Sequence, residues 1–227
     1  SGAQTKDGVC KTALRLHRHW ASTWATPYSA PSIASAQRLR RRIPMEKSII
    51  ISGFGGQGTL FAGQVLAYAA LDAGKHVTWI PSYGPEMRGG TARCTVTISD
   101  EEIGSPLTRN PSAVIAMNPP SLDRYERLMH PGGLMLANAS LINREMDRTD
   151  VRGIYIPAAR MAEAIGNPRL TNMIMVGALL ASEKILPLDV VKKSLKEHLP
   201  ARHQKTLPLN FEAMDQGAAF VKDAVVA

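Results

Sequence analysis

Residues 49–58 read Ile-Ile-Ile-Ser-Gly-Phe-Gly-Gly-Gln-Gly, an apolar run that leads directly into a glycine-rich loop. The β-branched run over 47–52 is typical of a strand that is buried on both faces. After the loop, apolar residues recur at three- and four-residue spacing through 58–74, which predicts a helix. Strand, glycine loop and helix together predict a βα unit.

Apolar patterns typical of strands and of helices alternate along the rest of the chain. They predict further strands at 76–80, 91–99, 113–117, 133–138 and 153–157, and further helices at 121–130, 158–165, 170–184, 188–199 and 208–225. Strands that alternate with helices predict a doubly wound, Rossmann-like α/β fold, in which a largely parallel sheet carries helices on both faces.

Residues 1–44 differ from the rest in composition and charge. They carry eight Lys or Arg and one Asp, so +7 of the formal net charge of +8 belongs to them, whereas 45–227 carries nineteen basic and eighteen acidic residues. Such a segment has the composition of a transit peptide, and its arginine cluster at 38–42 could bind nucleic acid or lipid. Alternatively, Met45 is the first methionine, and the leader lies before the true start. We predict a basic leader, 1–44, outside the fold, and one domain, 45–227.

Cysteine usage limits the chemistry that the chain can hold. Cys10 and Cys94 are the two cysteines, too few for an iron–sulfur cluster or a structural zinc site with four thiolates, so any cluster must belong to a partner. Cys94 falls in the predicted strand 91–99 and is expected to be a small buried side chain rather than a nucleophile. Without an apolar run of about 18 residues or a secretory signal, we expect a cytoplasmic protein that does not contact a membrane.

The glycine loop has the spacing of a phosphate-binding turn. Gly53 permits a tight turn, Gly55 lets the backbone approach an anion, and Gly58 lets the helix pack closely on the strand. The start of the helix adds unpaired N–H groups. A site for NAD also needs an acidic residue at the end of the second strand, but residues 80–82 are Ile-Pro-Ser. The loop therefore predicts a phosphate site without a dinucleotide, or a turn that only packs helix on strand.

A second unusual loop, residues 82–90, reads Ser-Tyr-Gly-Pro-Glu-Met-Arg-Gly-Gly. Its two opposite charges, Glu86 and Arg88, stand among glycines and a proline. They could pair with each other or cap a helix. Alternatively, the glycines could let Arg88 approach an anion or a partner chain.

Together, the loops at 51–58 and 82–90 resemble those of the gamma subunits of 2-oxoacid:ferredoxin oxidoreductases. The resemblance continues through 91–96, 103–106 and 172–178, and it covers the chain from Met45 onward. It implies that the chain works beside alpha and beta subunits, which hold thiamine diphosphate and, in some members, iron–sulfur clusters; a delta subunit is a further candidate partner. Such a complex decarboxylates a 2-oxoacid, reduces ferredoxin and releases an acyl-coenzyme A, and its gamma domain helps to form the coenzyme A region.

On this resemblance we expect the first loop to form a backbone anion cradle, with Glu86 and Arg88 shaping the adjoining wall for coenzyme A or for a subunit contact. The candidate residues are Gly53, Gly55, Gly56, Gln57, Gly58, Tyr83, Glu86, Arg88, Gly89 and Gly90. No catalytic or metal-binding residue is predicted, and no cofactor is expected on this chain alone. Asn172 could cap the helix that it begins or reach the glycine loop, and capping is favoured.

A different class remains as the alternative: a stand-alone nucleotide- or nucleic-acid-binding protein, suggested by the glycine loop and the positive charge. The position of that charge in 1–44 argues against this alternative, so no nucleic-acid partner is expected. The 2-oxoacid stays open between 2-oxoglutarate, branched-chain 2-oxoacids and pyruvate, because the resemblance places its pocket on the partner subunits.

Overall fold

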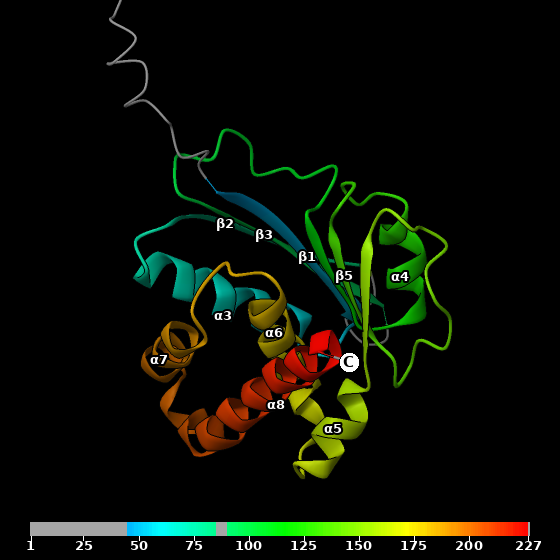
Figure 1. Cartoon of the computed structure of the whole chain (residues 1–227). Coiled ribbons are helices and arrows are strands. Elements are labelled where there is room, and N and C mark those ends of the chain that lie inside the picture. The colour runs from blue at the N-terminus through cyan, green and yellow to red at the C-terminus, as the bar shows by residue number, and fades with distance from the viewer. Residues whose placement is uncertain (1–44, 85–89, 227) are drawn as a thin grey trace, which may run out of the picture. The chain divides into compact units, whose positions relative to one another are not determined.

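The fold is known from a computed structural model, which describes residues 45–84 and 90–226 (Figure 1). The strands are β1 (Glu46–Phe54), β2 (His76–Tyr83), β3 (Thr91–Ser99), β4 (Ala113–Ala116), β5 (Leu134–Asn138) and β6 (Arg152–Ile156). The helices are α3 (Thr59–Asp72), α4 (Pro119–Glu126), α5 (Ala158–Ala164), α6 (Thr171–Ser182), α7 (Leu188–His198) and α8 (Leu207–Val226). Two short 3₁₀ helices, η1 (Pro168–Leu170) and η2 (Ala201–Thr206), join them.

Each predicted strand and helix is confirmed, and the differences lie at the ends. The helix predicted at 121–130 begins two residues earlier, because Asn118 caps it and prolines occupy its first two positions. The second strand was predicted to stop at Ile80, whereas β2 continues through Pro81 to Tyr83. Proline is tolerated there because β2 is an edge strand, where a missing N–H breaks no ladder on the outer side.

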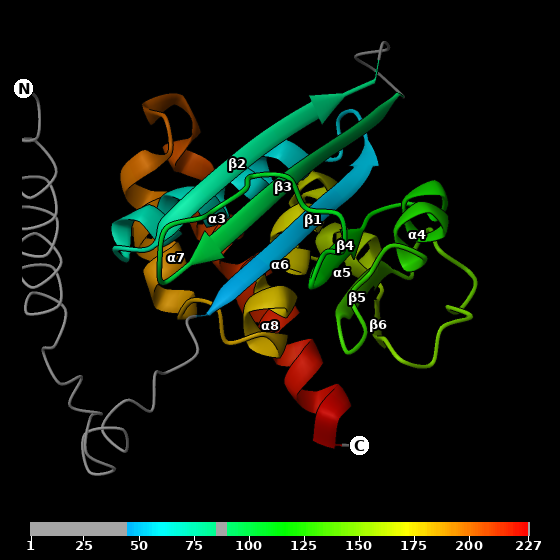
Figure 2. The same ribbon diagram turned by 90° about the horizontal axis from the view of Figure 1, so that it is seen from above.

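The sheet has the strand order β2-β3-β1-β4-β5-β6 (Figure 2). β1, β4, β5 and β6 pair in parallel, as predicted, whereas β3 runs antiparallel to both β1 and β2. The connection from β2 to β3 spans only 84–90, and a parallel crossover needs a dozen or more residues. The two described ends of the second glycine loop, Gly84 and Gly90, therefore lie at the edge of the sheet where β1 ends.

Side chains of β1 alternate between two cores. Ile49 and Ile51 belong to a large core beneath α3 and α5–α8, and Ile50 belongs to a smaller core beneath α4. Figure 1 shows α3 and α5–α8 on one side of the sheet and α4 on the other. The helix after β1 thus covers one face of the sheet, and the helix after β4 covers the other. Open α/β sheets bind ligands at such a switch point, outside the carboxyl ends of the strands. This places the expected site at the end of β1, where the first glycine loop lies.

Helices α6 and α8 lie in close contact within the large core. A Cβ atom added to Gly177 would lie 2.0 Å from the carbonyl oxygen of Met214, and one added to Gly217 would lie 1.9 Å from that of Ile174. Both positions therefore require a residue without a side chain, because backbone atoms of the facing helix occupy the space.

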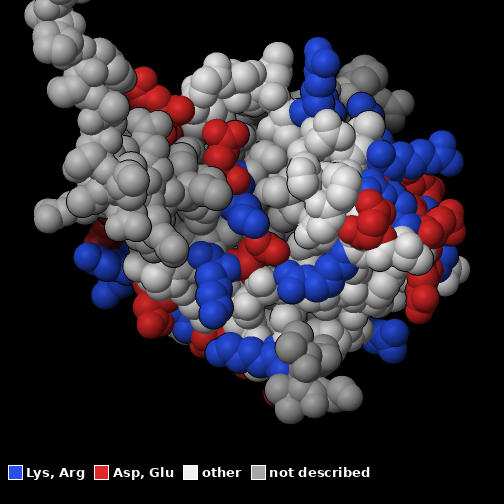
Figure 3. All heavy atoms as spheres, turned by 45° about the horizontal axis from the view of Figure 1, so that its top comes forward, with Lys and Arg blue, Asp and Glu red and all other residues white. Residues whose placement is uncertain are grey.

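The surface of the described residues carries both signs of charge. Figure 3 shows Lys and Arg interspersed with Asp and Glu on the face in view. In the ranges 45–84 and 90–226, no helix has both the length and the apolar character that crossing a membrane requires.

Candidate functional site

The two glycine loops meet at the carboxyl end of β1. The N–H of Gly55 donates to the carbonyl oxygen of Gly90 at 2.8 Å, and the N–H of Gly84 donates to that of Thr91 at 2.7 Å. The contact exists because β1 and β3 are antiparallel neighbours that place Phe54 opposite Thr91. The N–H of Gly55 is consequently engaged within the protein and is not available to an anion.

Two further residues of the first loop shape it from within. The Gln57 side-chain oxygen Oε1 accepts from the N–H of Phe54 at 2.6 Å, and the N–H of Gln57 donates to the Phe54 carbonyl oxygen at 3.1 Å. A Cβ atom at Gly53 would lie 2.4 Å from the same Oε1 and 2.8 Å from the Cβ of Met117. Gln57 therefore closes the turn, and Gly53 allows close packing.

The donors that remain are at the start of α3. Gly58 is the residue before the helix, with a left-handed φ of 74°, and neither a side-chain cap nor an acidic residue accompanies the first turn. Ala62 is the first residue of α3 whose N–H has a backbone acceptor, which is the carbonyl oxygen of Gly58. Within the described residues, the N–H groups of Gly56 and of 58–61 have no acceptor. We call this set the cradle; it carries the positive end of the helix dipole.

Asn172 holds the cradle in place from α6. Its Nδ2 donates to the carbonyl oxygen of Gly58 at 3.1 Å, and its Oδ1 accepts from the N–H of Met173 at 2.9 Å. The prediction that Asn172 caps its helix is wrong, because η1 runs directly into α6 and the residue before the helix is Leu170. Asn172 is 4% exposed, so it links two elements inside the protein.

Beside the cradle lies the α3 cavity, of about 670 Å³, between α3, η1, α7 and η2. Six of its lining residues are Gly56, Phe61, Tyr68, Arg169, His198 and Arg202. Arg169 and Arg202 are exposed, and neither forms an ion pair with a described residue. The cavity thus combines free N–H donors with uncompensated positive charge, which favours an anionic ligand.

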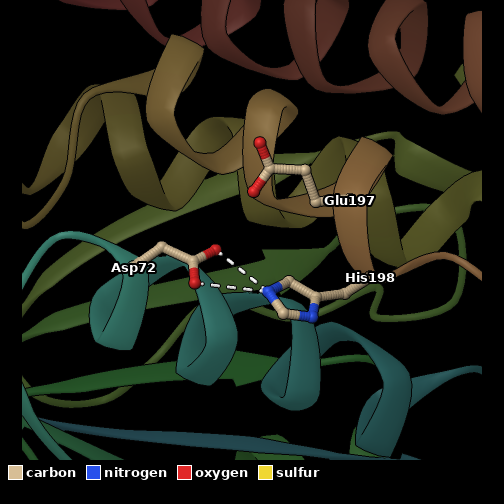
Figure 4. A group of neighbouring side chains, drawn as sticks. All are labelled: Asp72, Glu197 and His198. Carbon is tan, nitrogen blue, oxygen red and sulfur yellow. Dashed lines mark hydrogen bonds and ion pairs between the residues drawn. The ribbon is translucent and has the colours of Figure 1, made fainter.

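One wall of the cavity carries a small aromatic and ionic cluster. The rings of Tyr68 and His198 are stacked, with centroids 4.4 Å apart and an interplanar angle of 8°. His198 Nε2 lies 3.1 Å from Asp72 Oδ2, which links α7 to α3 (Figure 4). Glu197 completes a group whose potential ligand atoms all lie within 4.8 Å of one another, and Figure 4 marks an interaction between Asp72 and His198 but none to Glu197. The three side chains are exposed, and their arrangement is that of a hydrogen-bonded histidine and aspartate rather than of a built metal site.

Cys94 is a buried side chain and not a nucleophile, as predicted. It is fully buried beneath α3, and its Sγ donates to the carbonyl oxygen of Thr59 at 3.3 Å. Burial raises the pKa of the thiol to about 12. The thiolate that a nucleophile needs is therefore scarce at neutral pH.

The remaining candidates divide into two groups. Tyr83 is exposed at the end of β2, and Gly90 accepts from Gly55 at the start of β3. Glu86, Arg88 and Gly89 lie outside the described residues, so the wall that we expect them to form stays a prediction.

The sequence reading missed most of the α3 cavity. Phe61, Gln64 and Tyr68 line it from one face of α3, at a three- to four-residue spacing that is readable from the sequence. Arg169 and Arg202 carry no such signal, because they follow prolines in connecting segments whose position depends on helix packing.

Comparisons with known proteins identify the family of the chain. The family model described as pyruvate ferredoxin/flavodoxin oxidoreductase matches residues 48–220. Over 183 residues the chain is 35% identical to the ketoisovalerate oxidoreductase subunit VorA of Methanothermobacter thermautotrophicus. The aligned region covers 79% of this chain but only 37% of VorA. Over 187 residues it is 34% identical to the 2-oxoglutarate synthase subunit KorC of Methanocaldococcus jannaschii, covering 81% of the chain and 98% of the relative.

Two solved structures share the fold. The gamma subunit of a keto/oxoacid ferredoxin oxidoreductase from Geobacter sulfurreducens has a TM-score of 0.66 and 26% identity, over 78% of this chain and 99% of that one. The 2-oxoglutarate:ferredoxin oxidoreductase from Magnetococcus marinus, solved with 2-oxoglutarate, coenzyme A and succinyl-CoA bound, has a TM-score of 0.71 and 25% identity. That match covers 78% of this chain and 31% of the other.

Proposed function

This chain belongs to the pyruvate ferredoxin/flavodoxin oxidoreductase family, and from that premise we propose that it acts as the gamma subunit of a 2-oxoacid:ferredoxin oxidoreductase. The observation that carries the proposal is the pattern of coverage. The chain matches 98% of KorC and 99% of a solved gamma subunit, but 37% of VorA. Its fold therefore corresponds to a separate gamma polypeptide in some relatives and to one part of a longer polypeptide in others.

The proposed role is to help assemble the complex and to form its coenzyme A region. Coenzyme A carries several phosphate oxygens on an extended, drug-sized molecule. The cradle offers free N–H donors, and Arg169 and Arg202 add positive charge beside it. A cavity of about 670 Å³ lies within the usual size range of small-molecule sites. The aromatic side chains of Phe61 and Tyr68 offer surface against which an adenine could pack.

The chain's own residues would bind and orient the coenzyme rather than react with it. Gly56, Gly58 and the first turn of α3 would hold a phosphate group, and Asn172 would keep that turn fixed. Within the first loop, Gly53, Gly55 and Gln57 would act by shaping the turn, because their contacts are internal. The wall expected from Glu86 and Arg88 belongs to the same proposal.

The redox chemistry is assigned to partner subunits, named alpha and beta, with a delta subunit in some complexes. An iron–sulfur cluster does not fit the donor set of this chain, whose two cysteines include the deeply buried Cys94. Thiamine diphosphate and the clusters would supply 2-oxoacid decarboxylation and electron transfer to ferredoxin in those partners. A reducing cytoplasm is the proposed location, since Cys94 is a free thiol.

Reconstitution tests the assembly. The chain is combined with its candidate alpha and beta subunits, and ferredoxin reduction is followed with 2-oxoglutarate, a branched-chain 2-oxoacid or pyruvate in the presence of coenzyme A. We expect activity only when all subunits are present, and one acid to give the highest kcat/KM. Turnover by the isolated chain would contradict the proposal.

The coenzyme A assignment has its own test in the reconstituted complex. Arg169→Gln and Arg202→Gln each remove a charged donor, so we expect the KM for coenzyme A to rise about ten- to a hundredfold while the KM for the 2-oxoacid is unchanged. Arg160→Gln is the matched control, because Arg160 is exposed on α5 and does not line the cavity. Equal effects of all three substitutions would show that only overall charge matters.

A stand-alone nucleotide-binding protein remains the second candidate, because the cradle and the α3 cavity are formed by a single chain. Calorimetry on the isolated chain with NAD, coenzyme A and DNA separates the two. Tight binding of NAD or DNA by the chain alone would favour this second candidate over the subunit role.

A further inference from the structure

A second pocket lies on the opposite face of the sheet from the α3 cavity, beneath α4. This α4 pocket has a volume of about 220 Å³, and its polar lining includes Ser52, Ser82, Arg93, Ser121, Arg124 and Tyr125. It opens at the ends of β1 and β2 and the start of β3, beside the β1–β4 switch point. Ser52, Ser82 and Arg93 lie within the segments that carry the family resemblance, but neither the resemblance nor the proposed coenzyme A region assigns a role to them.

Arg93 is the central side chain of the α4 pocket. It lies on the inner strand β3, directly opposite Ser52 of β1 and Ser82 of β2 in the strand register. Its side chain is half-buried, and Nη1 donates to Tyr125 Oη at 3.2 Å. Among the described residues no carboxylate pairs with it. A guanidinium group has five N–H donors and is rarely buried without an anion, so Arg93 is left with donors to spare.

Arg124 brings a second guanidinium group from the helix. It lies 5.7 Å from the centroid of the Tyr125 ring and forms no ion pair with a described residue. The carboxylates of α4 are engaged elsewhere, since Asp123 and Glu126 pair with Arg144 at 2.5 and 2.8 Å. Among the described residues, the lining of the α4 pocket therefore holds two positive charges and no negative one.

Hydroxyl groups supply the other donors. Ser121 Oγ donates to Ser52 Oγ at 2.9 Å, and both serines are buried. The start of α4 contributes no free N–H, because Pro119 and Pro120 have none and the N–H of Ser121 donates to Asn118 Oδ1 at 3.0 Å. Recognition in this pocket thus depends on side chains, above all on the two arginines.

We propose that the α4 pocket binds a phosphate group. Arg93 from the sheet and Arg124 from the helix supply more donors than the two oxygens of a planar carboxylate can accept, whereas a tetrahedral phosphate offers oxygens to both arginines and to a serine. A volume of about 220 Å³ holds such a group with few further atoms and is too small for a whole nucleotide. The phosphate is either the free ion or the end group of a small phosphomonoester.

The test is calorimetry on the full chain with inorganic phosphate, methyl phosphate and succinate at constant ionic strength. We expect phosphate to bind and succinate to bind much more weakly, and the comparison with methyl phosphate identifies free ion or monoester as the preferred form. Arg124→Gln should weaken binding about ten- to a hundredfold, the usual effect of one charged hydrogen bond. Arg127→Gln, an exposed arginine just after α4 and outside the pocket, should leave binding unchanged.

Arg124 is the decisive position because it is exposed and its removal leaves the core intact, whereas Arg93→Gln also removes the hydrogen bond to Tyr125. The proposal is overturned if phosphate does not bind, if succinate binds as tightly, or if Arg124→Gln and Arg127→Gln act alike. Loss of binding in Arg169→Gln but not in Arg124→Gln would place the phosphate in the α3 cavity. The coenzyme A proposal could still hold in each of these cases, so the experiment tests the phosphate site of the α4 pocket independently of it.

Discussion

Glu126 shows at the residue scale how a buried charge joins two parts of the fold. It is 4% exposed, and its carboxylate accepts from Arg144 Nη2 at 2.8 Å and from the N–H groups of Asp147 and Arg148. Burial acts to raise the pKa of Glu126, but the hydrogen bonds from Arg144 and Asp147 outweigh it and lower the pKa. The ionised carboxylate therefore fastens α4 to the segment that leads into β6.

We expect Glu126→Gln to destabilise the protein by about 1–3 kcal/mol, because it leaves the Arg144 charge and two N–H donors with a weaker acceptor. The substitution preserves shape, so no cavity forms. Urea unfolding measures the change. Glu163→Gln, on the exposed surface of α5, is the control and should have little effect.

The pairing of Glu126 with Arg144 also predicts how the stability of the protein depends on pH. Because folding lowers the pKa of Glu126 from its ordinary value of 4.5, the stabilisation is present above that value and is lost as pH falls through the folded-state pKa. The difference in unfolding free energy between the wild type and Glu126→Gln should be largest near neutral pH and shrink below about pH 4. A difference that stays constant down to low pH would show that charge is not its cause.

Gly58 and Gly56 form a matched pair for testing the cradle. Both have positive φ, of 74° and 99°, but a Cβ at Gly58 would lie 2.5 Å from Asn172 Nδ2, whereas one at Gly56 meets nothing within 4 Å. Gly58→Ala should therefore cost about 1–3 kcal/mol more than Gly56→Ala in urea unfolding. In an Asn172→Ala background that excess should largely disappear, because the clashing amide is gone.

The crossing of α6 and α8 shows at the element scale where the chain tolerates no side chain. Gly177→Ala and Gly217→Ala would each force a methyl group against a backbone carbonyl group of the facing helix. We expect each to destabilise the protein by about 3 kcal/mol or more, since neither helix can move without disturbing the large core. Thermal and urea unfolding measure the loss. Gly104→Ala, which meets open space at an ordinary φ, is the control.

The antiparallel pair of β2 and β3 is the part of the sheet that periodicity did not predict. The strands were predicted at 76–80 and 91–99 from their composition, but periodicity does not reveal strand direction. The short connection at 84–90 forces an antiparallel pair, and this brings Gly90 to the N–H of Gly55. The first loop therefore has fewer free donors than its GxGxxG spacing suggests.

At the scale of the whole molecule, the two pockets flank the same edge of the sheet on opposite faces. The α3 cavity lies on the face covered by α3, and the α4 pocket lies on the face covered by α4. Both contain arginines without carboxylate partners among the described residues. This edge is therefore where we expect anionic ligands and neighbouring subunits to meet the chain.

The domain boundary is also a prediction for the whole molecule. Both cores that the structure describes are formed within 45–226. A chain that starts at Met45 should therefore keep a single cooperative unfolding transition at a temperature within a few degrees of the full chain. Calorimetry measures the transition. Loss of folding or of complex assembly in the shortened chain would show that 1–44 is structural.

The sequence by itself determined the order and type of the elements, the glycine turn after β1, the burial of Cys94 and the family likeness, because these depend on short-range periodicity and on local motifs. Only the tertiary structure decided that Gly90 accepts from the N–H of Gly55, that Asn172 holds Gly58 across 114 residues, and that Arg93 lies beneath α4 without a carboxylate partner in 45–84 and 90–226. The physical reason is that hydrogen bonds and charges act between neighbours in space. Strand order and helix packing, not distance along the chain, choose those neighbours.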